Sequence, residues 1–105
     1  PGLEEASLYA LHHHESFDGT GYPARLKGTD IPLVSRIISV IDSYDAMVSS
    51  RCYRKGLPHT EAISRLVLGS GTQFDSDVVQ TFIPIAERET SDVFAAAGTS
   101  VSAAL

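Results

Sequence analysis

The chain has 105 residues, of which 43% are hydrophobic, and its net charge is −5, from 13 acidic and 8 basic residues. This acidic balance excludes a general DNA-binding protein, because such proteins carry an overall basic surface, and no apolar run reaches the length of a membrane span. The sequence shows no basic and apolar leader and only one cysteine, Cys52, so we expect a cytoplasmic protein.

The first two predicted helices flank a long loop. Residues 4–15 contain neither glycine nor proline and predict a helix, whereas residues 16–32 contain successive glycine and proline turn signals. Pro32 suits the first position of a second helix, 32–50, where its missing N–H costs nothing. Apolar residues recur on this helix at three- and four-residue steps and predict a stripe that faces a core: Val34, Ile37, Ile38, Ile41, Tyr44 and Val48.

Two shorter helices are predicted after a basic connection over residues 51–58. The third helix, 60–68, is expected to turn three apolar side chains inward: Ile63, Leu66 and Val67. Asp75 is a candidate N-cap of the fourth helix, 76–88, which Pro84 is expected to kink or end. The fourth helix is expected to bury Val78, Val79, Phe82 and Ile83.

No strand pattern accompanies these helices, so the predicted fold class is all-α, a bundle of about four to five helices. Residues 1–88 form the domain portion. Residues 89–105 shift to Ala, Ser, Thr and Gly and predict a flexible or partly helical tail.

The candidate chemistry begins with the adjacent imidazoles of His13 and His14, which are good ligands for divalent metals. Neighbouring residues on a regular helix point about 100° apart, so two such histidines would serve two ions, or one ion where the helix unwinds. Solvated surface histidines are the alternative. On the second helix, Asp42 lies beside the apolar stripe, so its carboxylate is expected to be metal-bound or paired with Arg36 or Arg51.

Five polar residues near these groups are expected to have structural or surface roles. Glu15 and Asp18 are interpreted mainly as groups that orient ligands or pin the loop, and a direct metal ligand is the alternative for Glu15. Asp45 is expected to bond loop backbone, and His12 and His59 are expected to lie at the surface.

The segment His13-His14-Glu15 followed by a Gly-Tyr-Pro turn carries a resemblance to a known family. The pattern H-H-E-x-x-D-G-x-G-Y-P is complete, with eight fixed positions: His13, His14, Glu15, Asp18, Gly19, Gly21, Tyr22 and Pro23. With the later segments "LKGTDIPLVSRIISVIDSYDAM", "SSRCYR" and "GTQFDSDVV", the chain resembles the HD-GYP domains over residues 6–83. These domains are a branch of the HD metal-dependent phosphohydrolases.

The resemblance implies that the chain is part of an HD-type bundle and assigns roles to six residues. His13, His14 and Asp42 resemble the family's metal ligands, and Tyr22, Arg51 and Arg54 resemble groups that contact the substrate. The complete domain would use two or three divalent ions, iron, manganese or similar, to hydrolyse cyclic di-GMP to pGpG and GMP in bacterial signalling. A solvated basic patch is the alternative for the arginines.

The main departure from the family is that the chain contains no His-Asp dipeptide. In the family this doublet precedes the H-H-E segment, so the chain resembles only the C-terminal half of the domain. The isolated chain is therefore expected to lack phosphodiesterase activity. Its uncovered apolar faces are expected to promote self-association, for example as a homodimer.

Two other functions remain open from the sequence. In the first, the chain is an interaction module that docks a partner, such as a diguanylate cyclase domain, through the Gly-Tyr-Pro loop. In the second, it belongs to a metal-dependent phosphohydrolase that acts on another nucleotide.

Overall fold

The computed structural model describes the backbone of residues 2–97 and the side chains of residues 2–89. In this part of the chain the elements are α1 (Gly2–Leu11), the short 3-10 turn η1 (Gly28–Asp30), α2 (Leu33–Val48), α3 (His59–Leu68) and α4 (Ser76–Ala97). No strand forms among the described residues, and the predicted all-α class is confirmed. None of these helices is long and apolar enough to span a membrane.

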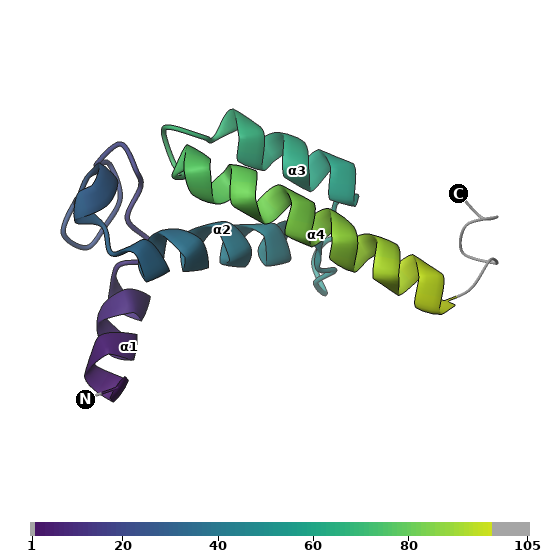
Figure 1. Cartoon of the computed structure of the whole chain (residues 1–105), viewed down its shortest axis with the longest axis horizontal. Coiled ribbons are helices and arrows are strands. Elements are labelled where there is room, and N and C mark those ends of the chain that lie inside the picture. The colour runs from purple at the N-terminus through teal and green to yellow at the C-terminus, as the bar shows by residue number, and fades with distance from the viewer. Residues whose placement is uncertain (1, 98–105) are drawn as a thin grey trace.

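The helices α2, α3 and α4 pack together, and α1 projects from the end of α2 where that helix begins (Figure 1). The loop between α1 and α2 lies at the same end of the molecule. Helix α1 has no buried residue in this structure, and the hydroxyl of Ser35 near the start of α2 donates a hydrogen bond to the carbonyl of Tyr9 in α1 (2.8 Å).

The core lies between α2, α3 and α4. Its four buried hydrophobic residues are Val40, Leu66, Phe74 and Val79, and the partly buried residues Tyr44, Met47, Ile63, Val78, Phe82 and Ile83 pack against them. The inward orientation predicted for Leu66 and for the apolar residues of the fourth helix is confirmed. Val67 was predicted to face inward and is instead 52% exposed, because the α3 face that carries it has no helix against it among the described residues.

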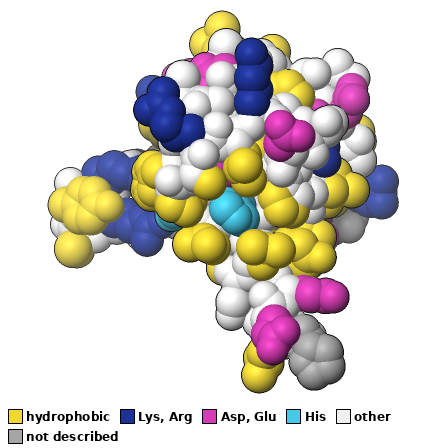
Figure 2. All heavy atoms as spheres, turned by 90° about the vertical axis from the view of Figure 1, so that its left-hand side faces the viewer, with side chains coloured by type: hydrophobic (Ala, Val, Ile, Leu, Met, Phe, Trp, Pro, Cys, Tyr) yellow, Lys and Arg dark blue, Asp and Glu magenta, His cyan; other side chains and the backbone are white. Residues whose placement is uncertain are grey.

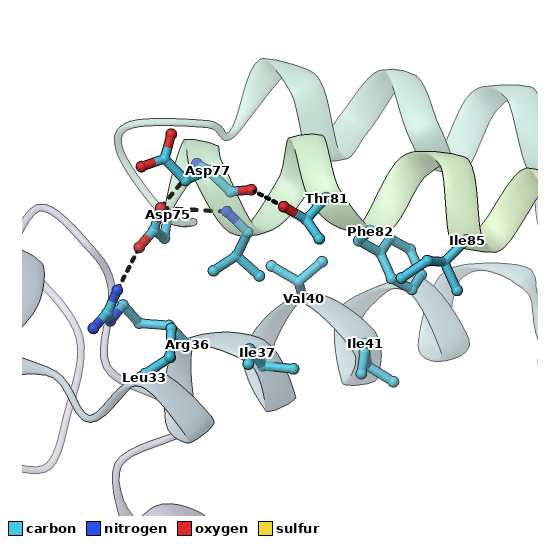
Figure 3. Close-up of a pocket in the computed structure, with 11 residues that line it drawn as sticks. Leu33, Arg36, Ile37, Val40, Ile41, Asp75, Asp77, Thr81, Phe82 and Ile85 are labelled. Carbon is cyan, nitrogen blue, oxygen red and sulfur yellow. Dashed lines mark hydrogen bonds and ion pairs between the residues drawn. The ribbon is translucent and has the colours of Figure 1, made fainter.

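The apolar stripe predicted on the second helix only partly faces this core. Val40 is fully buried, but Val34, Ile37 and Ile41 are exposed, so the prediction that they face a core is wrong. Ile37 and Ile41, with Phe82 and Ile85, line an apolar groove of about 520 Å³ between α2 and α4 (Figure 3).

Asp75 caps the start of α4, so its predicted role as the N-cap is confirmed. The Oδ1 atom of Asp75 accepts hydrogen bonds from the N–H groups of Asp77 (2.9 Å) and Val78 (3.4 Å). Its Oδ2 atom lies 2.7 Å from Nη1 of Arg36, which joins the start of α4 to α2 (Figure 3). The buried carboxylate is therefore both a helix cap and a partner for the partly buried guanidinium of Arg36.

The fourth helix is longer than the sequence predicted. It continues through Pro84 to Ala97, instead of ending near residue 88. A proline removes one intrahelical hydrogen bond, and that loss does not end this helix. The predicted tail thus begins inside α4, and its residues 98–105 lie outside the described part of the chain.

Candidate functional site

The three adjacent histidines lie in a turn that follows α1. The helix ends at Leu11, although the sequence predicted a helix through residue 15. In the turn, the N–H of His13 donates to the carbonyl of Ala10 (3.4 Å), and the N–H of Glu15 donates to that of His12 (3.1 Å). Because the helix has unwound, the rings of His13 and His14 come together, with centroids 3.8 Å apart.

The ring of His13 is oriented by the chain itself. Its Nδ1 atom bonds the carbonyl oxygen of Ala10. Because a carbonyl oxygen only accepts, Nδ1 carries the hydrogen and Nε2 has the free lone pair of the neutral ring. That Nε2 atom lies 3.9 Å from Oδ2 of Asp42 on α2. The structure thus brings together an imidazole from the first helical segment and a carboxylate from the second.

The Gly-Tyr-Pro loop folds back over the histidine turn. The N–H of Tyr22 donates to the carbonyl of His14 (3.4 Å), and the two rings stack with centroids 5.0 Å apart and planes inclined by 17°. Gly21 lies directly against the backbone of the turn, where a Cβ atom would be 2.3 Å from the nitrogen of Ser16. The loop and the histidines therefore form one packed unit.

Glu15 stands at the centre of this unit and is buried. Its carboxylate accepts hydrogen bonds from the N–H groups of Ala24 (2.8 Å) and Leu26 (2.9 Å). It also lies 3.1 Å from Nδ1 of His12. Burial alone would raise the pKa of Glu15, but these hydrogen bonds outweigh it and hold the pKa below its usual value.

A pocket of about 300 Å³ contains four of the six site residues expected from the sequence: His13, His14, Tyr22 and Asp42. The pocket is also lined by Ser39, Ser43 and Gln73, which the sequence analysis did not identify. Ser39 and Ser43 are one helical turn apart on either side of Asp42, and that spacing was the signal that could have revealed them. The view of the molecule from the loop end shows one histidine side chain that is largely enclosed by hydrophobic side chains (Figure 2).

Arg51 and Arg54 lie outside this pocket. They pair with each other through the backbone, where the N–H of Arg51 donates to the carbonyl of Arg54 at 2.8 Å. The guanidinium of Arg54 donates to the carbonyl of Ala46 near the end of α2. Both residues are exposed, so the structure places a basic turn beyond the end of α2 and not in the pocket.

The alternatives for the carboxylates are settled in part. Arg36, one predicted partner of Asp42, pairs with Asp75 instead. Asp18 pins the loop as predicted, because its Oδ1 accepts hydrogen bonds from the N–H and the hydroxyl of Thr20, and these bonds lower its pKa. Asp45 accepts a hydrogen bond from the hydroxyl of Ser49 (3.3 Å), so the prediction that it bonds loop backbone is wrong.

Two histidines predicted to be at the surface are partly buried. His12 packs beside Glu15 with a side chain that is 12% exposed. His59 begins α3, and its Nδ1 lies 2.7 Å from the hydroxyl of Tyr44. The contact of His59 joins α3 to α2, across 15 residues of sequence, whereas His12 contacts a residue only three positions away.

The pocket contains the types of ligand atoms, imidazole nitrogens and carboxylate oxygens, that bind divalent cations. The hydrogen bond from Nδ1 of His13 to a carbonyl is the support that metal-binding histidines commonly have, and it leaves Nε2 facing the Asp42 carboxylate. That carboxylate is 65% exposed and therefore accessible. Among the described residues, however, no group of three or more His, Cys, Asp or Glu side chains is arranged to hold an ion. The chain thus supplies part of a coordination sphere.

These features define an all-α protein whose polar pocket combines imidazole and carboxylate groups. A family model described as an HD domain matches residues 1–78. The chain therefore belongs to the HD domain family, and the HD-GYP resemblance noted in the sequence is confirmed. HD domain phosphohydrolases are generally metal-dependent.

Three curated relatives extend this comparison. The chain is 47% identical over 86 residues, 82% of its length, to a protein of Vibrio cholerae named "Cyclic di-GMP phosphodiesterase", of which it covers 18%. It is 42% identical to a "Probable cyclic di-GMP phosphodiesterase" of the same organism, with 77% of this chain and 18% of that protein covered. It is 42% identical to a "Cyclic di-GMP phosphodiesterase" of Thermotoga maritima, with 90% of this chain and 25% of that protein covered. The chain thus spans about a fifth to a quarter of the length of these relatives.

Proposed function

We propose that the chain contributes one side of the active site of a cytoplasmic phosphodiesterase that hydrolyses cyclic di-GMP to pGpG and GMP. The observation that carries this proposal is the approach of Nε2 of His13 to Oδ2 of Asp42, in a pocket that also contains His14 and Tyr22. The names of the three relatives support the substrate. The acidic composition with one cysteine supports the location.

In this proposal, His13, His14 and Asp42 hold divalent ions, iron, manganese or similar, together with ligands outside this chain. Bound divalent ions stabilise negative charge on phosphate oxygens and lower the pKa of a bound water. The residues of the chain orient these groups: Ala10 fixes the ring of His13, and Tyr22 covers one face of His14. Tyr22 is 61% exposed and offers its other face to the substrate.

Arg51 and Arg54 are proposed to bind the phosphates of the dinucleotide from outside the pocket. Guanidinium groups match phosphate geometry with two parallel hydrogen bonds. Both side chains are exposed on a turn fixed by its own backbone bonds. The turn begins three residues after the end of α2, the helix that carries Asp42.

A divalent cation is expected to bind the chain through Asp42 but not through Asp45. Replacing Asp42 with asparagine should weaken Mn²⁺ binding about 10-fold or more, because even groups that only support ligands are worth about 10–100-fold in affinity. Asp45→Asn is the matched control, since Asp45 lies one turn away on the same helix, is exposed, and accepts a hydrogen bond from the hydroxyl of Ser49. Isothermal titration of both variants with Mn²⁺ measures the difference. Equal affinities would contradict the proposed ion site.

The isolated chain is expected not to hydrolyse cyclic di-GMP. In the described part of the chain, His13, His14 and Asp42 do not form a three-ligand group, and a bridged pair of ions needs more ligands than these. Chromatography of nucleotides after incubation with the pure chain and Mn²⁺ tests this expectation. Production of pGpG that scales with chain concentration would show that these residues suffice.

An interaction module is the second proposed function, and the exposure of Tyr22 favours it. The Gly-Tyr-Pro loop presents this aromatic ring from a rigidly held turn, as docking sites for protein partners often do. A diguanylate cyclase domain is the proposed partner. In this case Tyr22→Ala should abolish binding to the purified partner domain, and Asp42→Asn should leave it unchanged.

Self-association into a homodimer is also proposed, through the apolar groove between α2 and α4. Ile37, Ile41 and Ile85 line this groove and are 37%, 49% and 48% exposed. Water contact with such a surface is unfavourable, and association removes it. Ile41→Glu should weaken this association, whereas Leu68→Glu, a control at an exposed position outside the groove, should not. Sedimentation of both variants measures the difference.

A further inference from the structure

The carboxylate of Glu15 has no role in the proposed function, although it is the most deeply buried acidic group beside the candidate site. Its side chain is 0% exposed. Its Oε1 atom accepts a hydrogen bond from the N–H of Leu26, and its Oε2 atom accepts one from the N–H of Ala24 and contacts Nδ1 of His12. A buried charge persists only where hydrogen bonds or counter-charges compensate it, and here three donors do so.

These donors come from both sides of the Gly-Tyr-Pro turn. Glu15 directly follows His14, whereas Ala24 and Leu26 follow the turn that presents Tyr22. One side chain therefore ties the exit of the turn to the histidines, across separations of 9 and 11 residues in sequence. The contact of the Tyr22 N–H with His14 ties the middle of the turn more weakly, at 3.4 Å.

We propose that Glu15 is a positioning residue, which clamps the Gly-Tyr-Pro loop onto the histidine turn and thereby keeps the ring of Tyr22 stacked on His14 at the mouth of the pocket. The carboxylate acts through other residues, because it is inaccessible and both of its oxygens accept hydrogen bonds from the chain. The purpose of this clamp, to keep the metal and substrate site in shape, rests on the proposed function, but the existence of the clamp does not.

The clamp can be tested without metal or substrate. The chain contains no tryptophan, so Tyr22→Trp introduces a single fluorescent reporter at the stacked position. In that background Glu15→Gln replaces one acceptor oxygen with an NH₂ group, which cannot accept a hydrogen bond from a backbone N–H. Glu61→Gln is the matched control, because Glu61 is exposed and pairs with Arg65 one turn away on the same helix.

We expect Glu15→Gln to shift the tryptophan emission to longer wavelength and to accelerate exchange of the Ala24 or Leu26 amide hydrogen by about 10-fold or more. Amides in α2, α3 and α4 should keep their protection, which shows that the variant is folded. Glu61→Gln should change neither readout. Unchanged emission and unchanged exchange at Ala24 and Leu26 in Glu15→Gln would overturn the proposal.

Mn²⁺ titration of the same variants separates a positioning residue from a direct ligand. A positioning role predicts Mn²⁺ affinity about 10–100-fold lower in Glu15→Gln, together with the altered emission and exchange. Loss of Mn²⁺ binding with normal emission and exchange would instead make Glu15 a ligand and overturn the clamp. If the parent chain binds no Mn²⁺, the proposed ion site fails, but emission and exchange still decide the role of Glu15.

Discussion

Replacing Asp75 with alanine is expected to lower the free energy of unfolding by about 3–5 kcal/mol, the range for removing one partner of a buried ion pair. The guanidinium of Arg36 would lose its 2.7 Å partner while its side chain is only 14% exposed. The start of α4 would also lose a cap for two N–H groups, which costs about 1 kcal/mol in other helices. Such a loss is a large part of the stability of a small domain.

Two further variants separate these contributions in urea unfolding experiments. Asp75→Asn keeps an oxygen that can cap α4 but removes the charge, so it should be less destabilising than Asp75→Ala. Asp77→Ala removes an exposed carboxylate from the same helix end and should cost no more than about 1 kcal/mol. Equal effects of Asp75→Ala and Asp77→Ala would show that the pair with Arg36 contributes nothing.

The Asp75 pair also gives the stability of the chain a defined pH dependence. Burial would raise the pKa of Asp75, but the bonds from Arg36 and the α4 N–H groups outweigh it and lower the pKa in the folded state. The unfolded state therefore binds the proton more readily. The stabilisation is complete above the unfolded pKa of about 3.9 and is lost as the pH falls through the lower folded value. Asp75→Asn should flatten this part of the profile.

The sequence predicted the bounds of those helices whose ends are marked by local signals such as proline and glycine. The second helix was expected over residues 32–50 and the third over residues 60–68, and the structure has Leu33–Val48 and His59–Leu68. The first helix was predicted to be too long, because no glycine or proline ends it. It unwinds where Glu15 and the carbonyl of His14 accept hydrogen bonds from residues 22–26, and such long-range contacts leave no local signal.

Burial and the site were harder to predict for the same reason. Periodicity identified Ile37 and Ile41 as one apolar face, but it does not tell whether another helix covers that face. The residues of the pocket came from a motif and not from geometry, so Ser39 and Gln73 were missed. His12 was expected at the surface because its partner, Glu15, is buried by a loop whose path the sequence does not reveal.

Replacing Gly21 with alanine is expected to separate the Gly-Tyr-Pro loop from the histidine turn. The new Cβ atom would lie 2.3 Å from the nitrogen of Ser16 and 2.5 Å from the carbonyl oxygen of His14. Both are backbone atoms, so no side-chain rotation relieves the clash. Overpacking of this kind costs about 1–3 kcal/mol, and the shift should weaken Mn²⁺ binding by about 10–100-fold, as for other groups that support ligands.

Two glycines with open surroundings make the Gly21→Ala result specific. Gly28 has a φ of +58° but nothing within 4 Å of an added Cβ, so Gly28→Ala should cost about 1–2 kcal/mol from its left-handed backbone without changing Mn²⁺ affinity. Gly2, at the start of α1, also has open space, so Gly2→Ala should change neither quantity appreciably. Urea unfolding and Mn²⁺ titration of the three variants distinguish lost stability from a displaced loop. The clash in Gly21→Ala forces the loop and the histidine turn apart. If this variant nevertheless bound Mn²⁺ like the parent chain, the contact between the loop and the histidine turn would not shape the ion site.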